Sequence, residues 1–146
     1  MNVDLTDAQR RIRDLSREFA AREVAPRVAE IDRTDEFPWD LYKRMAQLEL
    51  LGMTVPPEYG GAGADTVSWC VAQEELGRAS AAVADVQLLC KLMCDMILVN
   101  GSEGQRRAYL PAMVRGEKIC AIAQTYQIWE GTSQIQRLVI ARQLLG

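Results

Sequence analysis

Helix-start signals recur along this 146-residue chain, and they constrain its fold more than any other feature. Three times a Ser or Thr is followed three residues later by Gln, at Thr6–Gln9, Ser102–Gln105 and Ser133–Gln136. This is the spacing of a capping box, in which the hydroxyl accepts a backbone N–H and the Gln side chain reaches back to the cap residue. Asp65 and Ser80 stand before two more runs of helical periodicity, as N-cap residues do. The chain is therefore expected to be all-α, a bundle of helices.

The signals also predict where each helix runs. The expected helices cover residues 6–31, 38–50, 65–77, 80–101 and 102–111. Pro26 should bend or divide the first, because its ring removes a backbone hydrogen bond. Gly52 is expected to end the second helix, and Gly116 to end the segment that includes the last.

The segment Val55–Gly63, VPPEYGGAG, contains two prolines and three glycines, which exclude a helix. It lacks the lysine and the preceding strand of a phosphate-binding P-loop. An ordered connection between two helices is therefore the expected role of this segment.

Length, charge and the missing histidines limit what the chain can do. One domain with a buried core fits 146 residues. The net charge of −3 argues against nucleic acid, which requires a basic face. Without histidine, acid–base chemistry must use carboxylates, Lys, Tyr or Cys, and histidine-ligated metal sites are excluded. No apolar run approaches the ~20 residues of a membrane span, and the N-terminus does not resemble a signal peptide, so we expect a cytoplasmic protein without membrane contact.

Four cysteines are scattered along the chain without a CxxC pair, which predicts free thiols in a reducing compartment. Cys90 and Cys94 are four residues apart on an expected helix and could face one ligand. Buried Cys more often behaves as a small hydrophobic residue, so no metal site is expected.

The last stretch, residues 126–142, reads YQIWEGTSQIQRLVIAR. Glu130 lies between Trp129 and Gly131, just ahead of the helix expected to begin at Ser133. Desolvation by the indole ring favours the neutral carboxyl group, whereas the helix dipole favours the carboxylate. The pKa of Glu130 could therefore be tuned for proton transfer. The alternative is that Glu130 only caps the helix.

This stretch resembles, almost residue for residue, the C-terminal signature of the acyl-CoA dehydrogenases. The segments FPWDLYKRM (37–45), LGMTVPPEYGGAGADT (51–66) and QRRAYLPAMVRGEKI (105–119) are similar to the N-terminal helical domain of that family. The resemblance implies that Glu130 is the base that removes the α-proton of an acyl-CoA while flavin N5 accepts the β-hydride. It also places Thr125, Thr132 and Gln134 at positions that contact FAD in the family.

The chain departs from the family pattern after Thr125. The resemblance implies one helical domain over residues 1–146, in which residues 1–125 are similar to the N-terminal domain and residues 126–146 to the terminal motif and final helix. The family's middle β domain and most of its C-terminal helices are missing. Because a few contacts cannot enclose a dinucleotide, we expect no stable FAD binding by this chain alone. The missing parts would cover one face of the retained helices, and without them that apolar face is exposed. It therefore predicts a homodimer or a higher homo-oligomer.

Polar side chains interrupt the apolar run of residues 80–100. Gln87, Lys91 and Asp95 fall on one stripe at i,i+4 spacing. In one interpretation the stripe is a solvated face, with a Lys91–Asp95 surface pair of small energetic value. In the other, Lys91 and Asp95 project into the former acyl cavity and work with Glu130 as an acid–base set.

Three hypotheses for the function follow from these features. The first is non-redox acid–base chemistry, such as isomerisation, dehydration or cyclisation, on an acyl thioester of coenzyme A or a carrier protein. The second is a non-catalytic scaffold or accessory subunit, or a truncated dehydrogenase that uses FAD only together with a partner. The third is a degenerate or engineered remnant of the family. The sequence leaves these hypotheses open.

Overall fold

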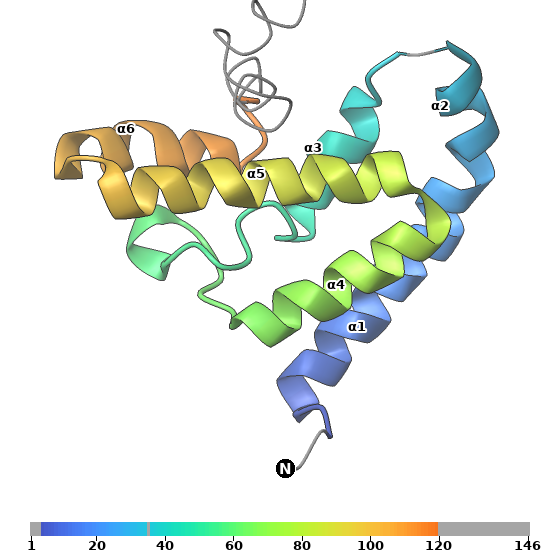
Figure 1. Cartoon of the computed structure of the whole chain (residues 1–146), viewed down its shortest axis with the longest axis horizontal. Helices are drawn as coiled ribbons and strands as arrows, with labels where there is room; N and C mark the ends of the chain where they lie inside the picture. The colour runs from blue at the N-terminus through green and yellow to red at the C-terminus, as the bar shows by residue number, and fades with distance from the viewer. Residues whose placement is uncertain (1–3, 35, 120–146) are drawn as a thin grey trace, which may run out of the picture.

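The structure is a computed structural model that describes residues 4–34 and 36–119, and every regular element in these ranges is helical (Figure 1). The all-α prediction is confirmed. None of the described helices is at once long and apolar enough to cross a membrane. The α-helices, in chain order, are α1 (Asp7–Phe19), α2 (Val28–Thr34), α3 (Trp39–Gln47), α4 (Thr66–Ala79), α5 (Ala81–Asn100) and α6 (Glu103–Val114).

The two capping boxes that fall on described residues are both present. At the start of α1, the Thr6 hydroxyl accepts from the Gln9 N–H at 3.3 Å, and the Gln9 side chain accepts from the Thr6 N–H at 2.9 Å. Ser102 and Gln105 form the same reciprocal pair at the start of α6. The third predicted box, Ser133–Gln136, lies outside the described residues.

Gln9 also connects the starts of two helices that are far apart in the sequence. Its Nε2 donates to the Asp65 carboxylate at 2.9 Å, and Asp65 caps α4 by accepting from the Ser68 N–H at 2.7 Å. The hydrogen bond from the Ser68 backbone is the main reason why the pKa of Asp65 lies below its usual range. These bonds hold α1 alongside α4.

Around Pro26 the first helical stretch is divided, as predicted, into α1 and α2, which are joined by turns of different winding. Helical turns continue to Thr34, beyond the predicted end at residue 31. The chain forms a π-helical turn, Ala20–Val24, ahead of Pro26, and then a tight 3-10 turn, Ala25–Arg27, that contains Pro26. Proline has no N–H to donate to the preceding helical turn. The wide π turn followed by the narrow 3-10 turn lets the helical path continue although this backbone hydrogen bond is missing.

Helix α3 is shorter than the predicted span of residues 38–50. It stops before Glu49, whose φ of 59° is the left-handed conformation that usually selects glycine. The Leu50 N–H donates to the Met45 carbonyl at 2.9 Å, which closes a Schellman motif. The expectation that Gly52 ends this helix was therefore wrong, because the chain has already turned at Glu49.

Two further helix ends lie later than predicted. α4 continues two residues past Gly77, and Ser80 then serves both as its C-cap and as the N-cap of α5. α6 continues through Pro111, which lies in its last turn, where a missing N–H costs one hydrogen bond. Gly116, with a φ of 66°, follows the end of α6, as predicted.

The loop between α3 and α4 is ordered, as expected, and contains one 3-10 turn at Pro57–Tyr59. The Tyr59 hydroxyl donates to the Glu103 carboxylate at 2.8 Å. The Arg107 guanidinium lies 5.9 Å from the centroid of the same ring. The loop is thereby attached to the first turns of α6.

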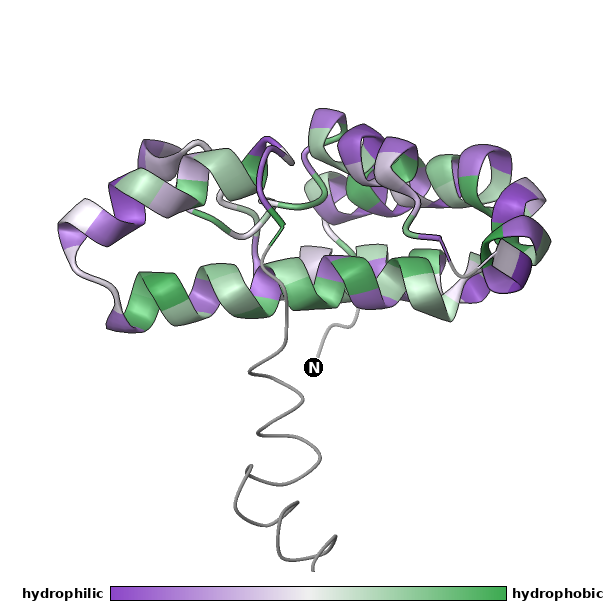
Figure 2. Ribbon diagram, turned by 90° about the horizontal axis from the view of Figure 1, so that it is seen from above, coloured by the Kyte–Doolittle hydropathy of each residue, from purple (hydrophilic) through white to green (hydrophobic). Residues whose placement is uncertain are grey.

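The hydrophobic core is formed by the end of α1 and its π turn, by α3 with the segment that follows it, and by α4, α5 and α6, and α5 runs along one side of the molecule (Figure 2). The Tyr42 hydroxyl donates to the Lys118 carbonyl at 3.0 Å, which fixes the end of the described chain against α3. The largest fully buried side chains are those of Tyr42, Met45, Leu50, Leu76, Leu110 and Met113.

Candidate functional site

The described part of the predicted site lies on α5, where Lys91 faces α4. The Lys91 Nζ lies 5.3 Å from the centroid of the Trp69 ring and forms an ion pair with Asp95, one turn along α5. The side chain of Lys91 is 18% exposed and that of Asp95 42%. The Lys91–Asp95 pair of the solvated-face interpretation is present, but the Lys91 side chain is mostly covered. The ammonium group lies half-sheltered between an indole face and a carboxylate.

Gln87, the third member of the predicted stripe, is in a different environment. It is fully buried, and its Nε2 donates to the Leu50 carbonyl at 3.0 Å and contacts the Met53 sulfur at 3.6 Å. Its amide therefore attaches α5 to the segment that follows α3. Each four-residue step along a helix rotates the direction of a side chain by about 40°. The stripe consequently winds from the core at Gln87 to partial exposure at Asp95.

The face of α4 beside Lys91 contains polar atoms that have no partner among the described residues. These atoms are the Trp69 Nε1 and the Gln73 Oε1, one helical turn apart. The Gln73 Nε2 donates to the Ala84 carbonyl at 2.9 Å, which connects α4 to α5. Sequence analysis did not single out Trp69 or Gln73. The only signal in the sequence was an aromatic and an amide side chain four residues apart within the expected helix of residues 65–77.

This arrangement suits the stabilisation of negative charge on an oxygen. A sheltered ammonium group interacts more strongly with a developing oxyanion than a solvated one does, because the local dielectric constant is lower. Asp95 orients the ammonium group. Glu130, the predicted base, lies outside the described residues.

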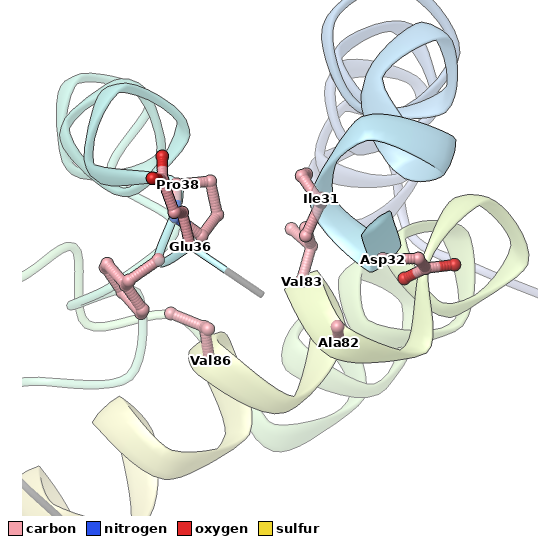
Figure 3. Close-up of a pocket in the computed structure, with 8 residues that line it drawn as sticks. Ile31, Asp32, Glu36, Pro38, Ala82, Val83 and Val86 are labelled. Atoms are coloured by element: carbon pink, nitrogen blue, oxygen red, sulfur yellow. The ribbon is translucent and has the colours of Figure 1, made fainter. Parts of the chain in front are cut away.

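A cavity of about 460 Å³ lies elsewhere on α5, near its N-terminal end (Figure 3). Its wall is mostly apolar, and the carboxylates of Asp32 and Glu36 lie on opposite sides of it. Neither Lys91 nor Asp95 lines the cavity, so the cavity and the ion pair are two separate features. The lining residues are Ile31, Asp32, Glu36, Phe37, Pro38, Ala82, Val83 and Val86.

The cavity beside the N-terminal end of α5 does not fit FAD. A pyrophosphate needs cationic groups or free backbone N–H groups, whereas this cavity presents two carboxylates. A neighbouring cavity of about 310 Å³ includes Arg27, but Arg27 is paired with Asp40 and lies near Glu30. The residues that the resemblance assigns to FAD lie outside the described residues: Thr125, Thr132 and Gln134.

Of the cysteines in the described part, Cys70 is exposed, whereas Cys90 and Cys94 are buried on α5. Hydrogen bonds with Cys94 and then with Tyr42 hold the pKa of Cys90 below its ordinary value. No group of three or more Cys, Asp or Glu side chains in residues 4–34 and 36–119 is arranged to hold a metal ion. Cys120 lies outside these ranges.

Comparison with known proteins gives the class of the fold and then the family. The family model for the acyl-CoA dehydrogenase N-terminal domain matches residues 6–117, which include all the described α-helices. The chain therefore belongs to the acyl-CoA dehydrogenase family, and the resemblance of residues 37–45, 51–66 and 105–119 to its N-terminal domain is confirmed.

Individual relatives support this assignment. A 3-(aryl)acrylate reductase of Clostridium sporogenes is 42% identical over 122 residues, which are 82% of this chain and 32% of the relative. An acyl-CoA dehydrogenase of Bacillus subtilis is 39% identical over 124 residues, 84% of this chain and 33% of the relative. The solved structure of butyryl-CoA dehydrogenase from Megasphaera elsdenii superposes with a TM-score of 0.74 at 30% identity, covering 82% of this chain and 32% of that one. The chain spans about a third of the length of these relatives.

Proposed function

We propose that this chain catalyses proton transfer on an acyl thioester without a flavin step, with Glu130 as the base and with Lys91 and Asp95 as its partners. The observation that carries the proposal is the half-sheltered position of Lys91 over Trp69, beside Asp95. An ammonium group in this position is suited to stabilise an enolate oxygen.

The proposed step balances within the protein and the substrate. The Glu130 carboxylate removes a proton α to the thioester carbonyl, so that a C–H bond breaks and an O–H bond forms. The electron pair moves to the thioester oxygen, where the Lys91 ammonium donates a hydrogen bond. With a β,γ-unsaturated acyl chain, return of the proton from Glu130 to the γ-carbon gives isomerisation. With a β-hydroxyacyl chain, that proton passes to the β-hydroxyl, which leaves as water, and the result is dehydration. With a second carbonyl in the chain, the α-carbon attacks it, its oxygen takes the proton, and the result is cyclisation. None of these outcomes needs an oxidant.

The substrate class follows from the family and extends to either thioester carrier. Coenzyme A and a carrier-protein pantetheine present the same thioester, and both are included in the proposal. We further propose that residues 1–146 fold as one helical domain and that the isolated chain does not retain FAD. We also propose a cytoplasmic location, in keeping with the exposed, reduced thiol of Cys70. The visible spectrum of the purified chain should lack a flavin absorption band, and a yellow protein would contradict this part of the proposal.

Isotope exchange tests the proton-transfer step. The purified chain is incubated with butyryl-CoA in D₂O, and deuterium at the α-carbon is followed by mass spectrometry. We expect incorporation by the wild-type chain and a loss of about 10²-fold or more in Glu130→Gln, because general base catalysis contributes about 10²–10⁴-fold. Glu58→Gln, a change at an exposed carboxylate in the loop, should leave the rate unchanged. Equal rates in wild type, Glu130→Gln and buffer would reject the proposal.

A second candidate function is that of a non-catalytic accessory or scaffold subunit, which completes a flavin site on a related full-length protein. The observation in its favour is that the chain spans only about a third of the length of its relatives. Size-exclusion chromatography of a mixture with a full-length relative tests this candidate, because co-elution supports it and separate elution opposes it. The same experiment on the chain alone tests the expected homodimer or higher homo-oligomer.

A further inference from the structure

An apolar stripe runs along the side of α5 that faces away from the core. Leu89, Leu92, Met96 and Val99 follow Asp85 at spacings of four, three, four and three residues. Met96 is 45% exposed and Val99 76%, and none of these four apolar residues belongs to the described core cluster or packs against it. This spacing is the a/d pattern by which one helix packs on another.

We propose that residues 133–145 of the same chain form a helix that packs on this stripe of α5. The Ser133–Gln136 capping box predicts the start of that helix. Ile135, Leu138, Arg142 and Leu145 then repeat at spacings of three, four and three residues. Both segments therefore present a row of mainly apolar residues at the three- and four-residue spacing with which helices pack on one another.

The charges favour this segment, rather than a second copy of α5, as the partner of the apolar stripe. Asp85 lies at the start of this apolar stripe and takes part in none of the ion pairs among the described residues. Asp95, a member of the polar stripe on the neighbouring side of α5, lies at its edge. Residues 131–146 contain Arg137 and Arg142 and no Asp or Glu. Packing of this segment on α5 brings opposite charges together, whereas two α5 stripes would bring a carboxylate from each copy into one apolar interface.

The path of the chain allows this contact. The described chain ends at Ile119, and the hydrogen bond from the Tyr42 hydroxyl of α3 to the Lys118 carbonyl fixes that end against the core on which α5 packs. Residues 120–132 can span up to about 45 Å when extended, and α5 is about 30 Å long. The segment can therefore reach any part of the stripe, and its tether gives it an effective concentration in the millimolar range.

The inference concerns packing only and stands independently of the proposed catalysis, so it is tested without an activity assay. Hydrogen–deuterium exchange is measured by mass spectrometry on the full chain at low concentration. We expect the amides of residues 136–145 to exchange at least about 10-fold more slowly than unstructured amides. Met96→Asp and Val99→Asp should abolish this protection. Val67→Asp, the matched change at a 49% exposed valine on α4, should leave it intact.

Charge exchange provides a second arm of the experiment. Asp85→Arg should reduce the protection of residues 136–145, and combining it with Arg142→Asp should restore at least part of that protection. Unchanged protection of α1 and α4 shows that each variant is folded. Three results would overturn the inference: no protection of residues 136–145 in the wild-type chain, full protection in both stripe variants, or protection that disappears on dilution together with a dimer mass in light scattering. The last result would assign the stripe to a second copy.

Discussion

Replacement of Lys91 by Met measures what the sheltered ammonium group contributes to stability. Met retains most of the apolar stem and removes the charge that contacts Trp69 and Asp95. A cation over an indole ring contributes about 0.5–1 kcal/mol at a partly exposed site. An i,i+4 ion pair contributes about 0.3–0.5 kcal/mol. Loss of both interactions should lower the free energy of unfolding by about 1 kcal/mol.

Urea unfolding followed by far-UV circular dichroism provides the assay. Lys43→Met is the matched control, because Lys43 is exposed and takes part in none of the ion pairs among the described residues. We expect the control to change the free energy of unfolding by less than about 0.5 kcal/mol. A double-mutant cycle of Lys91→Met with Trp69→Leu should give a coupling energy of about 0.5–1 kcal/mol.

Two results would refute this reasoning. If Lys91→Met and Lys43→Met unfold at the same urea concentration, the ammonium group is solvated and the contact with Trp69 contributes nothing. If Lys91→Met is more stable than the wild-type chain, the cost of desolvating the ammonium group exceeds its attraction to the ring and to the carboxylate. In either case Lys91 would not be the prearranged cation that the proposed function requires.

Three further predictions concern the backbone and the buried charges. Glu49→Gly should raise the free energy of unfolding by about 0.5–1 kcal/mol in urea unfolding, because a left-handed non-glycine residue is strained, and a loss of stability would contradict the Schellman assignment. Gly61→Ala should lower the free energy of unfolding by about 2–3 kcal/mol in the same assay, because the added Cβ would overlap a backbone carbonyl oxygen. Gly60→Ala should lower it by only about 1 kcal/mol, because the added Cβ meets open space and only the positive φ is unfavourable. Equal losses of stability in the two variants would contradict this reasoning. The hydrogen bond from Arg17 lowers the pKa of Glu75 in the folded protein. The stability that this bond provides is therefore complete above the unfolded-state pKa of about 4.5, and it is lost as the pH falls through the lower pKa of the folded state. An acid titration by circular dichroism should therefore show a shallower loss of stability in Glu75→Gln than in the wild-type chain, and identical profiles would contradict the assignment.

The starts of α1, α4, α5 and α6 were predictable from sequence because each depends on a local hydrogen bond from a cap side chain. The Thr6–Gln9 and Ser102–Gln105 capping boxes are confirmed, as are the N-caps Asp65 and Ser80. A short polar side chain ahead of an apolar periodic run is sufficient to specify such a start, whatever the rest of the chain does.

The ends of the helices were harder to predict because they depend on tertiary contacts. Glu49 adopts a conformation that its residue type disfavours, and Leu50 and Met45, which close the motif around it, are buried in the core. Ser80 ends one helix and begins another, a double role that the composition around Gly77 did not reveal. Glycine alone was therefore a poor guide to helix ends in this chain.

The candidate site was partly predictable. Sequence spacing placed Gln87, Lys91 and Asp95 on one stripe, but it could not give the orientation of that stripe relative to the core. Tertiary packing determines the orientation, because the segment after α3 contacts the buried Gln87 and α4 places Trp69 over the Lys91 ammonium. Residues from two helices meet at this point, and a pattern read along one helix cannot identify its partner.

A crystal structure of the full chain with bound butyryl-CoA tests the central claim most directly, because that claim joins Glu130 to the cation on α5. The account predicts the Glu130 carboxylate within reach of the substrate α-carbon and the Lys91 Nζ about 2.6–3.2 Å from the thioester oxygen. A Glu130 side chain directed away from the thioester, or a flavin ring bound beside it, would contradict the account.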